Sequence, residues 1–241
     1  MTPNFKIYFK ILIPSHLALR ISTIKYTPLL NLEILISGRG RNMEAILSAI
    51  KQGTIKNIRP SIVISDKPAA AGLKIASEKF CVPTNTLTSY ESRGWDYDQK
   101  LVQILEEYGV NKSAGVICLA GFMRVLSREV VRKYKMRIMN IHPALLPSFP
   151  GLRAQKQALD YGVKVSGCTV HFVDEGIDTG PILLQRTVPV FESDTEELLA
   201  ERILQVEHEL YPEALGLFSK GNIRIEGRKV SILHCSREDT K

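Results

Sequence analysis

The feature that most constrains this chain is the alternation of short apolar runs with segments of helical period. Residues 32–37 are mostly apolar and end at a Gly-Arg-Gly turn, after which apolar residues recur at spacings of three and four. A strand, a glycine loop and a helix in this order form the start of a βα unit, and the same alternation recurs along the chain. The pattern therefore predicts an α/β domain.

The last third of the chain departs from this alternation. Residues 165–173 and 181–190 are rich in β-branched side chains and alternate as antiparallel strands do, whereas residues 115–120 are fully apolar, which is typical of a strand buried in a parallel sheet. We therefore predict a doubly wound, Rossmann-like α/β fold with a mostly parallel sheet and an antiparallel C-terminal extension. The remaining predicted strands are 32–37, 61–65, 82–87 and 137–141; the predicted helices begin near residue 42 and span about 69–79, 95–108, 126–134 and 195–219; residues 222–232 are predicted to form a hairpin.

Charge separates the first 31 residues from the rest. The 241-residue chain has a formal net charge of +7, but residues 1–31 contain four basic residues and no acidic one, so the remainder holds 28 basic and 25 acidic side chains. This small excess argues against a nucleic-acid-binding module, which needs a basic patch interleaved with exposed aromatic residues. We expect residues 1–31 to be an N-terminal extension, either a basic targeting segment or a functionless one, and residues 32–241 to be a catalytic domain.

Cysteine spacing and hydropathy bear on the cellular compartment. The four cysteines stand far apart without a CxxC pair or a zinc-ligand spacing, so we predict neither a metal site nor a disulfide framework. The apolar stretch of residues 11–19 is shorter than the roughly 20 residues that a membrane-spanning helix needs. These features predict a cytoplasmic protein without a membrane or nucleic-acid partner.

Ligands of doubly wound folds collect at the carboxyl ends of the strands, and residues 38–42, Gly-Arg-Gly-Arg-Asn, occupy the first such place. The glycines allow a tight turn that can point N–H groups and a helix dipole at an anion, and the arginines add positive charge. The segment is not a dinucleotide fingerprint, because the third glycine is replaced by Met43. These residues alone leave both phosphate binding and an ordinary βα turn open.

A second place is residues 140–143, Asn-Ile-His-Pro, at the end of a predicted central strand. Side chains alternate along a strand, so Asn140 and His142 are predicted to share one side, where an amide can stabilise an oxyanion and an imidazole can carry a proton. A lone histidine at a strand end is more often structural, but the proline-rich segment 143–151 favours a site. The acidic loop of residues 174–180 is either a solvated turn or the source of a carboxylate that orients the imidazole and raises its pKa.

Four motifs, taken together, resemble a known family. They are Ser-Gly-Arg-Gly-Arg-Asn at 37–42, Leu-Ala-Gly-Phe-Met-Arg at 119–124, Asn-Ile-His-Pro-Ala-Leu-Leu-Pro at 140–147 and Asp-Thr-Gly-Pro at 178–181. Over about residues 32–226 the chain resembles the folate-dependent formyltransferases, and among them the phosphoribosylglycinamide formyltransferases. The resemblance implies transfer of the formyl group of 10-formyltetrahydrofolate to the amine of 5-phosphoribosylglycinamide in de novo purine biosynthesis, without a metal.

The resemblance also implies the site residues. It makes Asn140, His142 and Asp178 catalytic, with His142 as the proton donor and Asp178 as the carboxylate that raises its pKa. It assigns the substrate phosphate to Gly40, Arg41 and Asn42, the glycinamide to Glu207, and folate to Arg93, Met123, Arg124, Val125, Leu126 and Asn140; His171 matches a further active-site histidine. Arg41 stands where the family usually has a serine, so we expect tighter or more salt-sensitive binding of the phosphate.

The alternatives differ in the domains they require. A formyltetrahydrofolate hydrolase is expected to have an added N-terminal regulatory domain, and a methionyl-tRNA formyltransferase an added C-terminal one, and the sequence leaves room for neither. A nicotinamide oxidoreductase is disfavoured by the missing third glycine. The expected partners are the two small-molecule substrates, and we expect a monomer or a weak homodimer.

Overall fold

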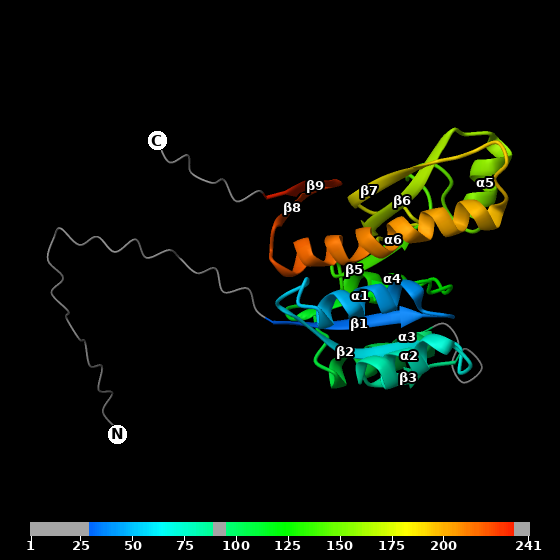
Figure 1. The fold of residues 1–241 in the computed structure, drawn as a ribbon. Helices are drawn as coiled ribbons and strands as arrows, with labels where there is room; N and C mark the ends of the chain where they lie inside the picture. Colours follow the sequence, from blue (N-terminus) through cyan, green and yellow to red (C-terminus); the bar gives the residue numbers. More distant parts are fainter. Residues whose placement is uncertain (1–28, 89–94, 234–241) are drawn as a thin grey trace, which may run out of the picture.

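The computed structural model describes residues 29–88 and 95–233, and its centre is a seven-stranded sheet (Figure 1). The strands are β1 (Leu30–Ile36), β2 (Ile58–Ser65), β3 (Thr84–Thr86), β4 (Gly115–Leu119), β5 (Ile138–His142), β6 (Val165–Phe172) and β7 (Ile182–Pro189). Their order is β3-β2-β1-β4-β5-β6-β7; the first five in this order run parallel, and β6 and β7 are each antiparallel to the preceding strand. The predicted fold class, including the antiparallel extension, is confirmed.

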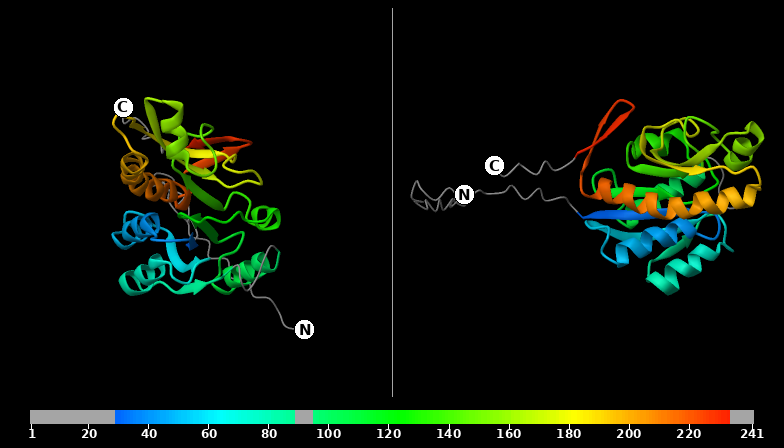
Figure 2. Two further views of the ribbon diagram at one scale, coloured as in Figure 1. Left: turned by 90° about the vertical axis from the view of Figure 1, so that its right-hand side faces the viewer. Right: turned by 45° about the horizontal axis from the view of Figure 1, so that its top comes forward.

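Helices cover both faces of the sheet. They are α1 (Arg41–Lys51), α2 (Ala71–Phe80), α3 (Trp95–Glu107), α4 (Arg128–Lys133), α5 (Ala154–Tyr161) and α6 (Glu196–Ser219), and β8 (Ile223–Glu226) pairs with β9 (Lys229–Ile232) in a separate hairpin. One face packs against α1, α2 and α6 and the other against α3 and α4 (Figure 2), so each face has its own apolar core. Burial on both faces explains why β4 is wholly apolar.

The strand order reverses beside β1, and this reversal positions the site. β1 pairs with β2 on one side and with β4 on the other, so the chain leaves the sheet in different directions after β1 and after β4. The two departing segments are joined where the Ser37 N–H donates to the Gly121 oxygen over 3.0 Å. A crevice at such a switch point is where doubly wound folds bind their ligands.

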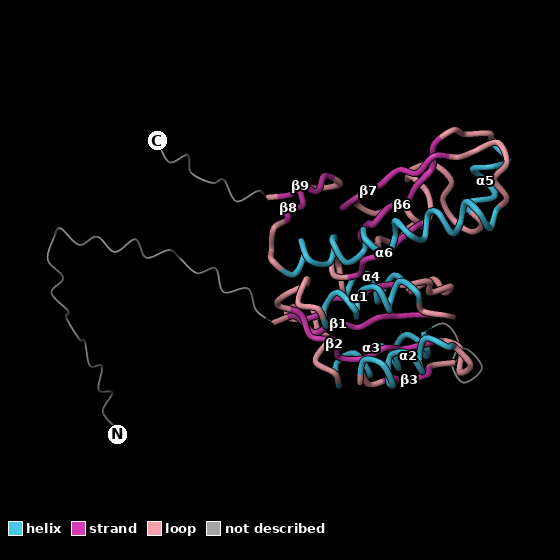
Figure 3. The backbone as a smooth tube through the Cα atoms, in the orientation of Figure 1, coloured by secondary structure: helices cyan, strands magenta, loops and turns pink. Residues whose placement is uncertain are grey.

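Two local features differ from the sequence-based expectation. Helix α5, at the right of Figure 3, was not predicted because only Ala154 and Ala158 of its residues are buried, and two alanines among polar residues give little periodic signal. Strand β2 begins before Pro60, whereas we expected it to begin at Ser61. A bulge explains this: Leu32 pairs with Pro60 and Glu33 with Ile62, so the register passes over Ser61 next to a residue that lacks an N–H.

Candidate active site

The loop between β1 and α1 has the geometry of an anion-binding turn. Gly40 has φ 71° just before α1, and no side chain of a described residue caps this helix end. An added Cβ at Gly40 would lie 3.1 Å from the Cα atom of Gly72, so the turn also requires a close approach that only small residues allow. The first N–H groups of α1 therefore stay available, and the helix dipole favours an anion beside them.

Arg41 and Asn42, in the first turn of α1, both contact α6. Arg41 Nη1 lies 2.9 Å from Glu201 Oε2 in an exposed ion pair. Asn42 Nδ2 donates to Glu207 Oε2 over 2.7 Å, and both side chains are buried. Burial raises the pKa of Glu207 to about 7, although the Asn42 amide and the Arg41 charge oppose it. The fold thus brings the predicted phosphate and glycinamide residues together, although they are far apart in sequence.

Asn140 and His142 lie on β5 and both contact Asp178. His142 Nδ1 is 3.2 Å from Asp178 Oδ2, and Asn140 Nδ2 donates to Asp178 Oδ1 over 3.5 Å. The Gly151 N–H donates to Asp178 Oδ2 over 2.8 Å, which ties the carboxylate to the proline-rich segment. On its other side, His142 Nε2 is 2.8 Å from the main-chain oxygen of Phe149. The histidine is therefore held at both ring nitrogens.

The protonation of His142 is subject to opposing effects. The Phe149 carbonyl can only accept, so Nε2 carries a hydrogen, and the Asp178 carboxylate favours a second hydrogen on Nδ1. Burial lowers the pKa of His142, however, and outweighs Asp178 and the Phe149 carbonyl, which both raise it. Asp178 thus acts on the pKa in the direction that the sequence analysis predicted, but it does not set the direction of the net shift. His142 is only 4% exposed, and its loss of hydration disfavours the charged ring more than the carboxylate favours it.

His171, on β6, completes the cluster from the neighbouring strand. It pairs with Asn140 across the antiparallel ladder, and its Nε2 atom lies 3.2 Å from Asn140 Nδ2 and 3.6 Å from Asp178 Oδ1. Its Nδ1 atom is 3.0 Å from the Phe172 oxygen and so carries the hydrogen, which leaves Nε2 to accept from the Asn140 amide. His171 thus fixes which way the Asn140 amide points.

The segment after β4 contains four of the residues predicted to bind folate. Met123 is 63% and Val125 81% exposed, whereas Leu126 is buried. Arg124 has its guanidinium 3.9 Å from the centre of the Tyr97 ring, on α3. Successive side chains therefore point in different directions, and Met123 and Val125 offer an exposed apolar surface.

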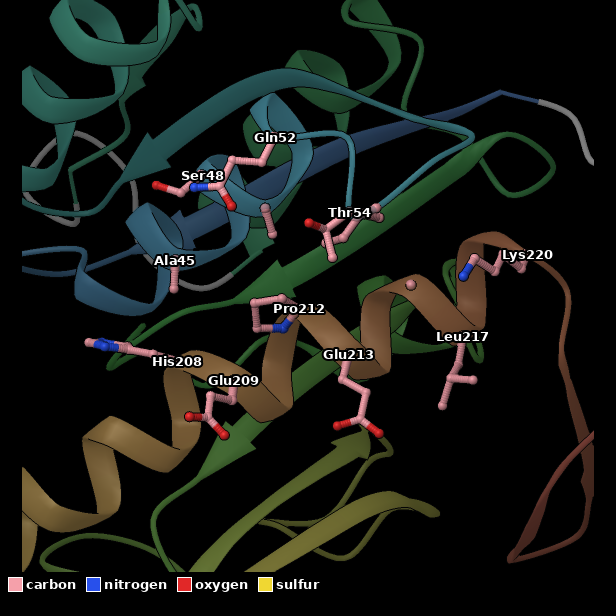
Figure 4. Close-up of a pocket in the computed structure, with 13 residues that line it drawn as sticks. Ala45, Ser48, Gln52, Thr54, His208, Glu209, Pro212, Glu213, Leu217 and Lys220 are labelled. Atoms are coloured by element: carbon pink, nitrogen blue, oxygen red, sulfur yellow. The ribbon is translucent and has the colours of Figure 1, made fainter.

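A pocket of about 560 Å³ lies between α1 and α6 (Figure 4). Small residues leave room there, because Ala49 and Gly216 are among those that line it and an added Cβ on Gly216 would meet no atom within 4 Å. His208 also lines the pocket, but Asn140, His142 and Asp178 do not. The pocket is therefore separate from the histidine cluster.

Other features of the described ranges, 29–88 and 95–233, can be stated briefly. Within them, no group of three or more histidine, cysteine, aspartate and glutamate side chains could hold a metal ion. None of the helices found there has the length and apolar character needed to cross a membrane. Cys81, Cys118 and Cys168 have free thiols.

Comparison with known proteins places the chain in a family. A family model described as formyl transferase matches residues 30–215. Phosphoribosylglycinamide formyltransferase of Escherichia coli (strain K12) is 39% identical over 198 residues, which cover 81% of this chain and 90% of that protein. The chain belongs to the phosphoribosylglycinamide formyltransferase family. The family predicted from the four sequence motifs is therefore confirmed.

A solved structure and a longer relative extend this comparison. The crystal structure of glycinamide ribonucleotide transformylase 1 from Symbiobacterium toebii has a TM-score of 0.81 and 46% identity, covering 86% of this chain and 95% of that one. The trifunctional purine biosynthetic protein adenosine-3 of Bos taurus is 45% identical over 195 residues, or 80% of this chain. The chain spans only 18% of the length of that trifunctional relative. The formyltransferase family therefore includes both short chains and parts of much longer ones.

Some contacts of the candidate site could not be predicted from the sequence. The Phe149 oxygen that accepts from His142 is a main-chain atom, and any residue at that position would supply it. Tyr97, which lies against Arg124, belongs to the apolar face of α3, and the sequence pattern there indicates core packing only. Arg93, predicted to bind folate, lies outside the described residues.

Proposed function

We propose that this chain transfers the formyl group of 10-formyltetrahydrofolate to the amine of 5-phosphoribosylglycinamide, giving formylglycinamide ribonucleotide and tetrahydrofolate in de novo purine biosynthesis. The cluster of Asn140, His142 and Asp178 carries the proposal. It lies at the end of β5, and the glycine loop and the segment of residues 123–126 follow the neighbouring strands β1 and β4. Membership of the formyltransferase family supports the same reaction.

The glycine loop is the proposed site of the substrate phosphate. The N–H groups from Gly40 to Asn42 begin α1 and favour an anion. Asn42 Oδ1 is buried and has no hydrogen-bond partner among the described residues. Glu207, which lies beside it, is the proposed contact to the glycinamide. The Arg41 charge that we expected beside the phosphate is partly neutralised by Glu201.

The chemical step needs a donor for the oxygen of the formyl group. When the amine attacks the formyl carbon, this oxygen becomes negative, and protonated His142 can donate to it. The Asn140 amide can also donate to it once one of its two N–H groups leaves its present acceptor, His171 Nε2 or the more distant Asp178 Oδ1. The hydrogen on His142 Nε2 is bonded to the Phe149 oxygen, so it must exchange that acceptor for the intermediate. The bond between the formyl carbon and the folate nitrogen then breaks, and this nitrogen takes the proton of His142, directly or through water. The proton that the attacking amine loses restores the protonated histidine, so no covalent enzyme intermediate is needed.

Folate is the proposed ligand of the segment after β4, together with Asn140 and Arg93. Met123 and Val125 present exposed apolar surface for its ring system. Because the Arg124 guanidinium stacks on Tyr97, we expect Arg124 to contribute through its main chain.

We further propose the setting in which the enzyme works. The proposed catalytic domain begins at Leu30 and not at the expected residue 32, because Leu30 and the residue after it belong to β1; the proposed extension before it lies almost wholly outside the described residues. The proposed compartment is the cytoplasm, where the free thiols of Cys81, Cys118 and Cys168 would stay reduced. The proposed state is a monomer or a weak homodimer that acts on its two small-molecule substrates.

The decisive experiment compares turnover of 10-formyltetrahydrofolate with and without 5-phosphoribosylglycinamide, measured by absorbance of the folate product and by mass spectrometry of the formylated amine. We expect folate turnover that depends on the amine and yields one formylated product per turnover. Equal turnover without the amine, with release of formate, would assign the chain to the hydrolases instead. Absence of turnover in both arms would overturn the proposed function.

A further inference from the structure

The segment of residues 121–127 joins β4 to α4 without regular secondary structure. Among the described residues, no main-chain group of Arg124, Val125 or Leu126 has a hydrogen-bond partner. These N–H and C=O groups lie between the exposed side chain of Met123 and the start of α4. Free main-chain donors and acceptors next to apolar surface suit the hydrogen-bonding edge of a flat heterocycle, provided that the backbone is held still.

Asp98, in the first turn of α3, holds the end of this segment. Its Oδ2 atom accepts from the Ser127 N–H over 3.1 Å, and the side chain is 5% exposed. Ser127 is also the N-cap of α4, where its Oγ atom accepts from the Val130 N–H over 3.4 Å. A hydrogen bond from an amide to a buried carboxylate is among the stronger ones in proteins. Asp98 therefore fixes the point at which the segment becomes helix.

Tyr97, the residue before Asp98, holds the middle of the segment. Its ring is 1% exposed and lies 3.9 Å from the guanidinium carbon of Arg124, close enough for a cation–π contact. Arg124 forms no ion pair with any residue that the structure describes, and its Nε atom is buried without a hydrogen-bond partner there. The Tyr97 hydroxyl is likewise buried without a partner in that part of the chain. The contact that fixes Arg124 is therefore with the ring.

The beginning of the segment is held from the glycine loop. The Ser37 Oγ atom accepts from the Met123 N–H over 2.9 Å, and the Ser37 N–H donates to the Gly121 oxygen over 3.0 Å. The segment is thus held at its beginning by Ser37, the residue after β1, and at its middle and end by two successive residues of α3. What lies between these contacts is the stretch with unpaired main-chain groups.

We propose that Tyr97 and Asp98 are positioning residues for the folate cosubstrate. They contact the segment and not the cosubstrate, and they hold its free main-chain groups in the arrangement that binds the heterocycle. This inference rests on the proposed function, in which residues 123–126 bind folate. It adds α3, which carries none of the residues implied by the family resemblance, to the elements on which cosubstrate affinity depends.

The test measures KM for each substrate and kcat in Tyr97→Leu and Asp98→Ala. We expect the KM for 10-formyltetrahydrofolate to rise about tenfold in each variant, on the scale of one lost cation–π contact or charged hydrogen bond. The KM for 5-phosphoribosylglycinamide and kcat at saturating folate should stay unchanged, because the glycine loop and the histidine cluster are untouched. Binding of tetrahydrofolate, followed by calorimetry, should weaken by the same factor.

Conservative variants separate positioning from general packing. Tyr97→Phe keeps the ring and loses only a hydroxyl without a partner, and Asp98→Asn keeps an oxygen that can accept from Ser127, so both should retain the wild-type KM for folate. Arg124→Met removes the same cation–π contact by changing Arg124 and not the buried Tyr97, so it tests the contact if Tyr97→Leu does not fold. Its effect should not add to that of Tyr97→Leu where both fold.

Two outcomes would overturn this inference while leaving the proposed function intact. One is an unchanged folate KM in folded Asp98→Ala and Arg124→Met. The other is an equal rise of both KM values, since general loosening of the fold would produce it. Failure of the proposed function is recognised separately, because the wild-type chain would then show no amine-dependent transfer at all.

Discussion

At the scale of single residues, His142 shows how placement decides chemistry. Its two ring nitrogens face a carboxylate and a carbonyl, which favour the charged form, while its burial favours the neutral form. Burial outweighs these two groups and lowers the pKa of His142. Acid catalysis works best when the pKa of the donor lies near the working pH, so the carboxylate and the carbonyl, which oppose the lowering, keep His142 closer to a useful value.

The first prediction concerns His142 itself. His142→Ala should lower kcat by at least about 10²-fold, on the scale of a lost general acid. Steady-state kinetics with both substrates saturating measures this, and circular dichroism checks the fold. His208→Gln is a suitable control, because His208 lies outside the cluster and should tolerate the change. Near-normal turnover of His142→Ala would remove this residue from the mechanism.

The second prediction concerns Asp178 and the pH profile. If His142 acts as an acid, the rate falls as pH rises through its pKa. Asp178 raises this pKa, so Asp178→Asn should lower it further and move the falling limb toward lower pH. Asparagine tolerates the φ of 53° at this position and can still accept from the Gly151 N–H, so folding should be retained. A pH–rate profile with an unmoved falling limb would contradict the pairing.

At the scale of elements, α6 connects the core to the site. Thr195 caps its start by accepting from the Leu198 N–H, and the helix packs along α1 and carries Glu207 to Asn42. Helix α1 in turn begins at the glycine loop. The position of Glu207 beside the loop is therefore a consequence of how α1 and α6 pack. A change in that packing should alter the contact between Glu207 and Asn42 at the proposed substrate site.

The third prediction compares two glycines in helices. Gly216→Ala in α6 adds a Cβ into open space, so better helix propensity should raise Tm by roughly 2–4 °C without loss of activity. Gly72→Ala in α2 places a Cβ 2.5 Å from Ile36 Cδ1 and 3.2 Å from the Gly40 Cα atom. This variant should lower Tm and raise the KM for the phosphorylated substrate. Differential scanning calorimetry measures the two Tm values, and steady-state kinetics measures KM. Equal Tm changes in the two variants would contradict the structure.

At the scale of the whole molecule, one carboxyl group sits inside the sheet. Glu33, in the middle of β1, has no exposed surface, and neither of its oxygens has a hydrogen-bond partner in residues 29–88 or 95–233. Burial raises the pKa of Glu33 well above its ordinary value. The folded protein therefore holds a proton that the unfolded chain releases, and this makes global stability depend on pH.

The fourth prediction follows from the sign of that shift. The contribution of Glu33 is fully present below the ordinary glutamate pKa and is lost as pH rises toward the folded-state pKa, by up to about 1.4 kcal/mol per pH unit. Glu33→Leu should therefore gain free energy of unfolding relative to wild type, and more at pH 8 than at pH 5. Urea titrations at both pH values measure this. The exposed Glu192→Gln serves as the control, and a gain equal at both pH values would show that Glu33 does not titrate in this window.

Local patterns in the sequence were enough for the architecture, and they brought the candidate site residues to notice. The alternation of apolar runs and helical periods predicted the order of the elements, because strand and helix periods are set by the backbone geometry of neighbouring residues. The same patterns placed the glycine loop after one predicted strand and His142 after another, whereas the roles of these residues and of Asp178 came from the family resemblance and stay predictions. Helix α5 escaped prediction because its buried face consists of two alanines.

Only the tertiary structure decided how these residues affect one another. The direction of the His142 pKa depends on burial by distant segments, and its partner at Nε2 is a main-chain oxygen that no residue type reveals. The contact between Asn42 and Glu207, and that between Arg124 and Tyr97, each join residues on different elements. Local sequence determines which groups stand at strand ends, whereas desolvation and side-chain contacts act through space and exist only once the chain has packed.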